Sequence, residues 1–95
     1  MYSKLDPLLH SQLRLAIISL LINIGEAEFV YIREKTNATG GNLSVQIDKL
    51  SNAGYITVHK SFKGKKPQTL CKITRKGIAA FEKYVNDLKG YIDID

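Results

Sequence analysis

The sequence predicts a single, mostly helical α+β domain, and three observations support this fold class. Its 95 residues are enough for one modest hydrophobic core and too few for two. Four segments carry apolar residues at spacings of three and four, which is typical of helices with one buried face. Two neighbouring segments, between residues 55 and 74, alternate apolar and polar residues as half-buried strands do. We therefore expect a β-hairpin flanked by helices.

The first predicted helix covers residues 7–24 and stops at Gly25. Asp6 and Pro7 suit its start, because a proline at the first helical position loses no hydrogen bond. The helix is apolar on two faces, and a small domain cannot cover both with its own chain. We therefore expect a homodimer, with a C-terminal helix of the same chain as the alternative cover. The predicted dimer interface, completed by two C-terminal tyrosines, comprises Leu5, Leu8, Leu15, Ile18, Ile22, Tyr84 and Tyr91.

A helix-turn-helix unit is predicted at about residues 28–54. Its first helix extends to about residue 36, and a tight turn at Asn37 leads into the second. Thr39 suits the N-cap of the second helix, because its hydroxyl can accept an unpaired N–H of the first turn. Gly54 tolerates the left-handed backbone that ends a helix. The apolar residues of the second helix recur on one side and are Leu43, Ile47 and Leu50.

The opposite side of this second helix is polar and nearly free of acid. Asn42 and Gln46 can each make the paired donor–acceptor contact that fits adenine in a major groove. Val45 offers a methyl surface to thymine, and Lys49 suits a guanine edge or a phosphate. The glycines that open the helix let backbone N–H groups approach a phosphate closely, and a plain solvated helix face is the alternative. The predicted recognition helix residues are Thr39, Gly40, Gly41, Asn42, Ser44, Val45, Gln46 and Lys49.

After Gly54 the helical spacing gives way to the alternation of strands. Residues 55–59 and 69–74 are the strands of the predicted hairpin, which covers about residues 55–74. Cys71 is expected to point inward as a small hydrophobic residue and not to act as a redox sensor. The connecting residues 60–68 contain Gly and Pro and are predicted to be a loop. The hairpin residues expected to contact a phosphate backbone are Lys60, Lys63, Gly64, Lys65, Lys66 and Arg75.

Thr74 is predicted to cap a C-terminal helix at about residues 75–89, which Gly90 interrupts. No repeat, low-complexity segment or interdomain linker is visible, so residues 1–95 are treated as one domain. The inward stripe expected for this helix comprises Ile78, Phe81, Val85 and Leu88.

The distribution of charge indicates a polyanionic partner. The formal net charge is +5, and residues 49–81 contain no Asp or Glu. A loop that served solubility alone would normally mix both signs, so phosphate contact is the preferred interpretation. The cations of this acid-free stretch are Lys49, Lys60, Lys63, Lys65, Lys66, Lys72, Arg75 and Lys76.

Several classes of function find no support in the sequence. His10, His59 and Cys71 are too widely spaced for a metal site that needs several such ligands together. No Gly-rich phosphate loop follows a strand and no catalytic constellation can be assembled, so neither an enzyme nor a cofactor is expected. Arg14 and Asn23 interrupt the apolar first helix, and the N-terminus lacks a signal-peptide pattern. We expect a cytoplasmic protein without membrane contact.

Three segments carry a resemblance to a known family. They are LDPLLHSQLRLAIISLL at residues 5–21, GNLSVQIDKLSNAGYI at residues 41–56 and KITRKGIAAFEKY at residues 72–84. In this order they resemble the small MarR-like and ArsR-like transcriptional regulators of bacteria and archaea. The more specific features are the AGYI motif that ends the second helix-turn-helix helix and the ITxxG motif that closes the hairpin.

The resemblance implies a winged helix-turn-helix fold, with three helices, a two-stranded β-hairpin wing and a C-terminal helix. It also implies a homodimeric regulator of transcription that binds double-stranded DNA sequence-specifically, with a recognition helix in the major groove and a wing beside the backbone. The chain lacks the cysteine and histidine clusters of ArsR-like metal sensors, and it is short for the longer flanking helices that shape effector pockets in MarR-like proteins. The alternative is a protein–protein interaction module, which would replace the basic surface with a hydrophobic one.

Overall fold

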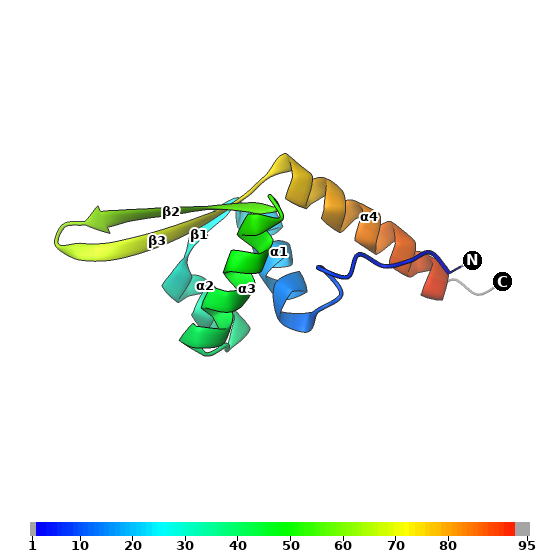
Figure 1. Cartoon of the computed structure of the whole chain (residues 1–95), viewed down its shortest axis with the longest axis horizontal. Coiled ribbons are helices and arrows are strands. Elements are labelled where there is room, and N and C mark those ends of the chain that lie inside the picture. Colours follow the sequence, from blue (N-terminus) through cyan, green and yellow to red (C-terminus); the bar gives the residue numbers. More distant parts are fainter. Residues whose placement is uncertain (1, 93–95) are drawn as a thin grey trace.

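The computed structural model describes residues 2–92, which form four helices and a small antiparallel sheet (Figure 1). In chain order the elements are α1 (Gln12–Ile24), β1 (Glu26–Glu28), α2 (Phe29–Thr36), α3 (Gly40–Asn52), β2 (Ile56–Lys63), β3 (Lys66–Ile73) and α4 (Arg75–Ile92). The predicted mostly helical α+β class is confirmed. Helices α1, α2 and α3 form the body of the domain, and the β2–β3 hairpin and α4 project from it in opposite directions (Figure 1).

Helix α1 begins later than the predicted residue 7. Asp6 instead closes a separate turn, in which its Oδ1 accepts the N–H of Leu8 at 2.8 Å and its carbonyl accepts the N–H of His10 at 2.9 Å. Ser11 then caps α1, because its Oγ accepts the N–H of Arg14 at 3.4 Å. Two start signals stand in tandem, and the second one begins the continuous helix.

The sheet contains a third strand that the sequence did not reveal. Strand β1 pairs antiparallel with β3 in the order β1-β3-β2, with Ala27 opposite Cys71. Gly25 adopts φ 85° and turns the chain from α1 into this strand, and its carbonyl accepts the N–H of Ile73 at 3.1 Å. Three residues are too few to show a strand's alternation, so the predicted two-stranded hairpin was incomplete. The extra strand ties the base of the hairpin to the body.

Strands β2 and β3 are longer than predicted. Residues 60–68 were expected to form a loop, but pairing continues as far as Lys63 opposite Lys66. Only Gly64 and Lys65 turn the chain, and Gly64 supplies the positive φ of 67° that such a tight turn needs. The alternation was hidden because both faces of a projecting ribbon carry polar residues. Each strand has eight residues, which corresponds to a ribbon roughly 25 Å long.

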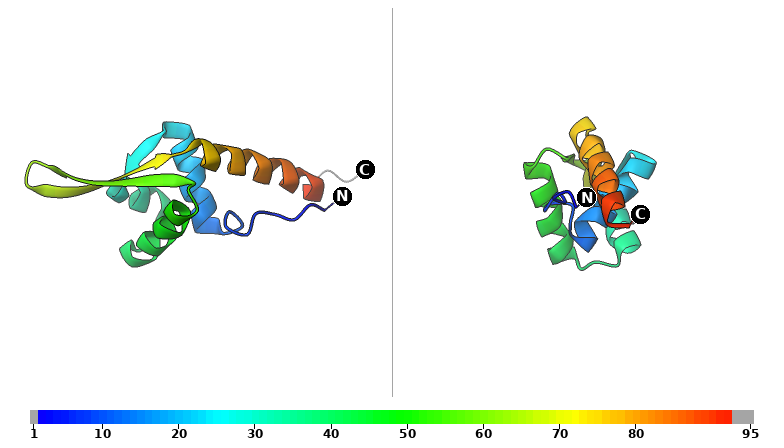
Figure 2. Two further views of the ribbon diagram at one scale, coloured as in Figure 1. Left: turned by 45° about the horizontal axis from the view of Figure 1, so that its top comes forward. Right: turned by 90° about the vertical axis from the view of Figure 1, so that its right-hand side faces the viewer.

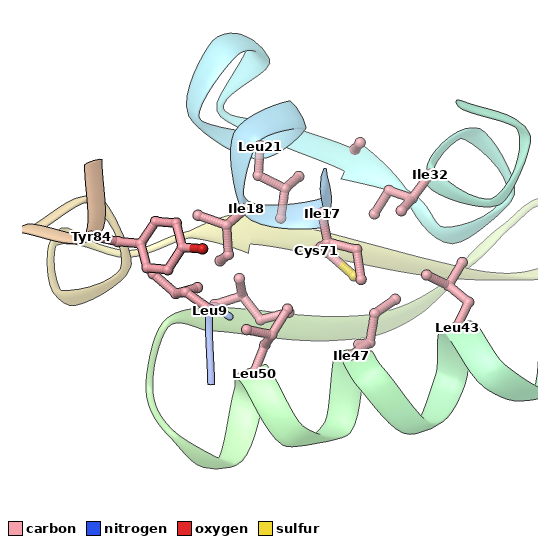
Figure 3. Packing of buried hydrophobic residues seen from close by; sticks show 12 residues of the cluster. Leu9, Ile17, Ile18, Leu21, Ile32, Leu43, Ile47, Leu50, Cys71 and Tyr84 are labelled. Carbon is pink, nitrogen blue, oxygen red and sulfur yellow. The ribbon is translucent and has the colours of Figure 1, made fainter. Parts of the chain in front are cut away.

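The hydrophobic core lies between α1, α3 and the sheet (Figure 3). Cys71 is fully buried at its centre, which confirms its predicted place as a small core residue. Ile18 is also fully buried, so its assignment to the dimer interface was wrong. Helix α1 buries Ile17, Ile18 and Leu21, whereas Ile24 at its end is 46% exposed. The predicted inward residues of α3 are confirmed as buried, and these are Leu43, Ile47 and Leu50.

Helix α4 runs on to Ile92 and passes through Gly90 without a break, so its predicted end near residue 89 was too early. The helix leaves the body on the side away from the hairpin (Figures 1 and 2). The N-terminal arm lies beside its far end, where the hydroxyl of Tyr91 donates to the carbonyl of Ser3 at 2.6 Å. The ring of Tyr91 also packs against Tyr2, with centroids 5.0 Å apart.

The face of α4 that meets the body differs from the predicted stripe. Tyr84 is 5% exposed, and its hydroxyl lies 3.1 Å from Nδ1 of His10. Its assignment to the dimer interface was therefore wrong, because this ring already fills the gap between α4 and the start of the chain. Ile78 and Val85, expected to be inward, are each 37% exposed. Rotation of α4 about its axis thus leaves an apolar side uncovered.

Candidate nucleic-acid interface

Helix α3 presents a polar side to solvent, opposite its buried stripe. Thr39 caps the helix as predicted, since its Oγ1 accepts the N–H of Asn42 at 3.2 Å. Gly54 adopts φ 80° just past the helix end, as the sequence also predicted. Gly40 and Gln46 are the half-buried members of the predicted set. The exposed members are Thr39, Gly41, Asn42, Ser44, Val45 and Lys49.

The N-terminus of α3 is open and lies beside a cation from the preceding helix. A Cβ built at Gly41 would meet no atom within 4 Å, and one at Gly40 would lie 3.9 Å from Nη1 of Arg33. The helix N-terminus already favours an anion, and the Arg33 guanidinium strengthens that preference. Sequence reasoning missed Arg33 because the contact joins two helices. The available signal was the pair of basic residues, Arg33 and Lys35, in the last turn of α2.

The amide of Gln46 is held by other side chains. Its Oε1 accepts a hydrogen bond from Nη1 of Arg14 in α1, and its Nε2 donates to Oδ1 of Asn42 at 2.9 Å. Arg14 is itself fixed, because its Nε donates to the carbonyl of Leu8 at 2.6 Å. The sequence marked Arg14 only as an interruption of an apolar helix, since nothing in the residue order links positions 14 and 46.

The wing, defined as the β2–β3 hairpin, carries cations at its tip. Lys63 and Lys66 pair across the strands, and residues directly opposite in an antiparallel pair share one face. Lys65 lies in the turn between them, and all three are exposed. Glu28 of β1 lines one hollow with Lys63 and Lys66, and its carboxylate accepts a hydrogen bond from Nε2 of Gln68. Within residues 2–92, none of the three lysines forms a salt bridge. The tip lysines, Lys63, Lys65 and Lys66, are therefore available to an outside anion.

Lys60 joins the wing to the polar side of α3. It shares the β2 face of Ile56 and Val58, which is the face that packs towards α3. Lys60, Ser44 and Asp48 line one hollow between α3 and the sheet. This face of the wing, which carries Val58 and Lys60, is called its inner face. It adjoins the polar side of α3 at Ser44, and contact with one duplex requires such an arrangement.

Phe62 is an exposed aromatic residue within the basic wing. It is 74% exposed, lies opposite Pro67 and follows the same strand face as Lys60. A benzyl group so far from the core contributes little to folding, while an aromatic ring between cations suits contact with sugars or bases. Sequence reasoning missed Phe62 because the segment was expected to be an irregular loop.

The base of the wing is closed by a threonine at the end of β3. Thr74 Oγ1 donates to the carbonyls of Gly54 and Tyr55 at 2.7 and 3.0 Å, and it accepts the N–H of Gly77 at 3.0 Å. The last contact confirms the predicted cap of α4. Arg75 follows directly and lies at the base of the wing. The sequence prediction had grouped it with the tip lysines.

Tyr55 connects the wing base to the N-terminal turn. Its hydroxyl donates to Oδ2 of Asp6 at 2.6 Å, and the ammonium of Lys76 lies 5.8 Å from its ring centroid. Burial, together with the hydrogen bond and the negative charge of Asp6, raises the pKa of Tyr55 from 10.0 to about 12. The hydroxyl therefore remains a donor at neutral pH.

The remaining residues predicted for a dimer interface lie partly at the surface. Tyr91 is 39% exposed on α4, next to the N-terminal arm. The other four are half-buried and pack against the edge of the core, and these are Leu5, Leu8, Leu15 and Ile22. Other exposed apolar residues were not predicted for an interface, and they are Tyr2 in the N-terminal arm and Ile78, Val85 and Ile92 along α4.

In residues 2–92, no three His, Cys, Asp or Glu side chains are grouped closely enough to hold a metal ion. Across the same residues, every helix is too short or too polar to cross a membrane.

Burial raises the pKa of the Cys71 thiol to about 11, so this thiol stays protonated near neutral pH.

Comparison with known proteins gives consistent results. The model of a family described as winged helix DNA-binding domain matches residues 13–92. An uncharacterized protein of Methanocaldococcus jannaschii is 37% identical over 79 residues, which cover 83% of this chain and 86% of the relative.

Two solved structures share the fold of this chain. The transcriptional regulator homologue from Pyrococcus horikoshii OT3 superimposes with a TM-score of 0.84 at 29% identity, over 90% of this chain and 85% of its own. Bacillus subtilis PadR, solved in complex with operator DNA, gives a TM-score of 0.68 at 22% identity, over 77% of this chain and 46% of its own. The similarity to PadR is one of fold alone.

Proposed function

The chain belongs to the winged helix DNA-binding domain family, as a DNA-binding regulator, and we propose that it recognises specific duplex sequences as a homodimer. In this proposal α3 enters the major groove and contacts base edges, while the wing follows the backbone. The residues proposed to meet DNA on α3 are those predicted above, with Arg33 added at its N-terminus. On the wing, the proposal relies on Lys60, Phe62 and the tip lysines.

One observation carries the proposal, namely that the exposed side of α3 and the inner face of the wing adjoin through Lys60 and Ser44. A recognition helix and a basic ribbon on one surface can engage the same duplex, with the helix contacting bases and the ribbon contacting phosphates. Val45 is 50% exposed on α3, and Asn42 is exposed towards α1, where it lines a hollow with Gln12 and Leu13. Such methyl and amide groups can contact base edges.

The dimer rests on the uncovered side of α4. This helix has 18 residues, about 27 Å of length, and much of it lies beyond the body. Ile78 and Val85 are partly exposed along it, and Ile92 is 66% exposed near its end. Apolar residues in one row on a projecting helix favour a second copy of the chain, packed by two-fold symmetry. Two copies would present two α3 helices to half-sites about one helical turn apart.

Selection of bound duplexes from a random pool, followed by titration, tests this function. We expect a pseudo-palindromic site that binds at least about a thousandfold more tightly than random duplex at physiological salt. Light scattering should give the mass of two chains, and Val85→Asp, which places a charge in the proposed seam, should give one. An unselective pool, or a monomer that binds as tightly as the wild type, would contradict the proposal and favour the interaction module.

A further inference from the structure

The side chains of Arg14, Gln46 and Asn42 form a continuous hydrogen-bonded chain from α1 to the exposed side of α3. Arg14 donates to Oε1 of Gln46, and Gln46 donates through Nε2 to Oδ1 of Asn42 at 2.9 Å. The inner end is anchored, because Nε of Arg14 donates to the carbonyl of Leu8 at 2.6 Å. Asn42 is the exposed end, where a nucleic acid would meet it.

The donor-to-acceptor direction of these hydrogen bonds is set by the guanidinium of Arg14. A guanidinium has five N–H donors and no acceptor, whereas a side-chain amide can be turned to present either its oxygen or its nitrogen. Arg14 therefore forces Gln46 to turn its oxygen inward and its nitrogen towards Asn42. That nitrogen in turn attracts the oxygen of Asn42, so the NH₂ group of Asn42 is left for the groove.

We propose that Arg14 is a positioning residue for DNA recognition, which fixes the amide of Asn42 as a hydrogen-bond donor through Gln46. This inference rests on the proposed function and narrows it, because Gln46 becomes a relay and Asn42 the residue that contacts the base. A donor suits a base with major-groove acceptors, and guanine offers two, N7 and O6. Cytosine presents only its N4 donor there, so cytosine is disfavoured at the base that Asn42 faces.

The substitution Gln46→Glu should reverse the orientation of the Asn42 amide without changing the size of residue 46. Both oxygens of the new carboxylate accept, one from Arg14 and the other from Nδ2 of Asn42. Asn42 then directs Oδ1 towards the groove and favours a donor, such as N4 of cytosine or N6 of adenine. Arg14→Met removes the orienting group instead and leaves the amide of Asn42 able to adopt either orientation.

The experiment is selection of bound duplexes from a random pool for the wild type and for both variants. Asn52→Glu serves as the matched control, because it adds the same charge to an exposed position on the same helix, outside the hydrogen-bonded chain. Thermal unfolding of each variant confirms that it is folded. We expect one position of the site to change in Gln46→Glu from guanine or thymine, whose major-groove polar atoms are all acceptors, to cytosine or adenine, which each carry a donor there. The relative occupancy should change by about tenfold.

The other variants should behave differently at that position. Arg14→Met should lose the preference there while the rest of the site is retained, and Asn52→Glu should weaken binding uniformly with the preference intact. If Gln46→Glu selects the same base as the wild type, or the same as Asn52→Glu, the relay is refuted while the proposed function stands. If Gln46→Glu fails to fold, retention of the wild-type base by Arg14→Met refutes the relay. An unselective wild type would overturn the proposed function and the relay together.

Discussion

The α-carbon of Gly77 lies directly against the carbonyl oxygen of Tyr55, where α4 crosses the start of the wing. A Cβ built at Gly77 would lie well inside 3.0 Å of that oxygen and 2.9 Å from Cδ1 of Ile73. The same carbonyl accepts the hydroxyl of Thr74 and the N–H of Thr74. The position of the wing relative to α4 thus depends on a glycine at this point.

Gly77→Ala should destabilise the domain, because the obstructing atom is backbone and cannot rotate away. We expect a loss of about 3 kcal/mol in the free energy of unfolding, measured by urea denaturation. Gly41→Ala is the matched control. It also adds a methyl group inside a helix but meets nothing within 4 Å, so its stability should be unchanged or higher. Equal effects of the two substitutions would contradict the close approach at Gly77.

The hydroxyl of Tyr55 should contribute a stability that disappears at high pH. Its pKa in the folded chain is about 12, above the ordinary 10.0, so deprotonation is harder in the folded state than in the unfolded state. The contribution is therefore complete below pH 10 and is lost as the pH rises to about 12. We expect Tyr55→Phe to lower the free energy of unfolding by about 1 kcal/mol at pH 7.

Denaturation of the wild type and Tyr55→Phe across this pH range measures the difference. Because the two proteins differ only in the hydroxyl of residue 55, the difference between their unfolding free energies isolates its contribution. The two curves should converge between pH 10 and about 12. A constant gap across that range would show that Asp6 and the buried environment do not hold the proton on Tyr55.

Cys71 should be inert while the domain is folded. Its thiol is fully buried, and burial raises its pKa from 9.0 to about 11, which lowers the thiolate fraction about a hundredfold near neutral pH. A disulfide reagent should therefore label the chain at the rate of unfolding, and rapidly in denaturant. Labelling of the native protein as fast as the denatured one would refute this account of the site.

Gln46→Ala and Lys65→Ala should separate base contact from backbone contact. Loss of Gln46 should weaken the selected site more than random duplex, because it disturbs the amides on α3. Loss of Lys65 should weaken both duplexes by a similar factor and reduce the salt slope by about two per dimer. Equilibrium titrations of both variants on both duplexes provide the comparison. Similar losses on the two duplexes for both variants would count against the division of labour between α3 and the wing.

Local signals in the sequence were sufficient for α3 and its caps. Its periodicity places Leu43, Ile47 and Leu50 inward. The helix begins after the capping hydroxyl of Thr39 and ends before the positive φ of Gly54, as expected. Each of these features depends on residues within about one turn of one another. The class of fold could be predicted for the same reason, because periodicity and turn residues define the order of elements.

Features that depend on contacts between distant segments could not be predicted in this way. The rotation of α1 and α4 about their axes decides that Ile18 and Tyr84 are buried, and two apolar faces on one helix do not reveal which one meets the body. The bond between Arg14 and Gln46 joins two helices and changes the role assigned to Gln46. Strand β1 owes its existence to pairing with β3, since three residues carry no pattern of their own.

Binding of the wild-type chain to a random duplex at several salt concentrations, followed by fluorescence anisotropy, tests the central claim most directly. Three tip lysines in each of two subunits would neutralise about six phosphates, so the logarithm of the affinity should fall with the logarithm of the salt concentration at a slope of about −5. A slope near zero, or no binding at low salt, would contradict a basic wing that lies on a DNA backbone.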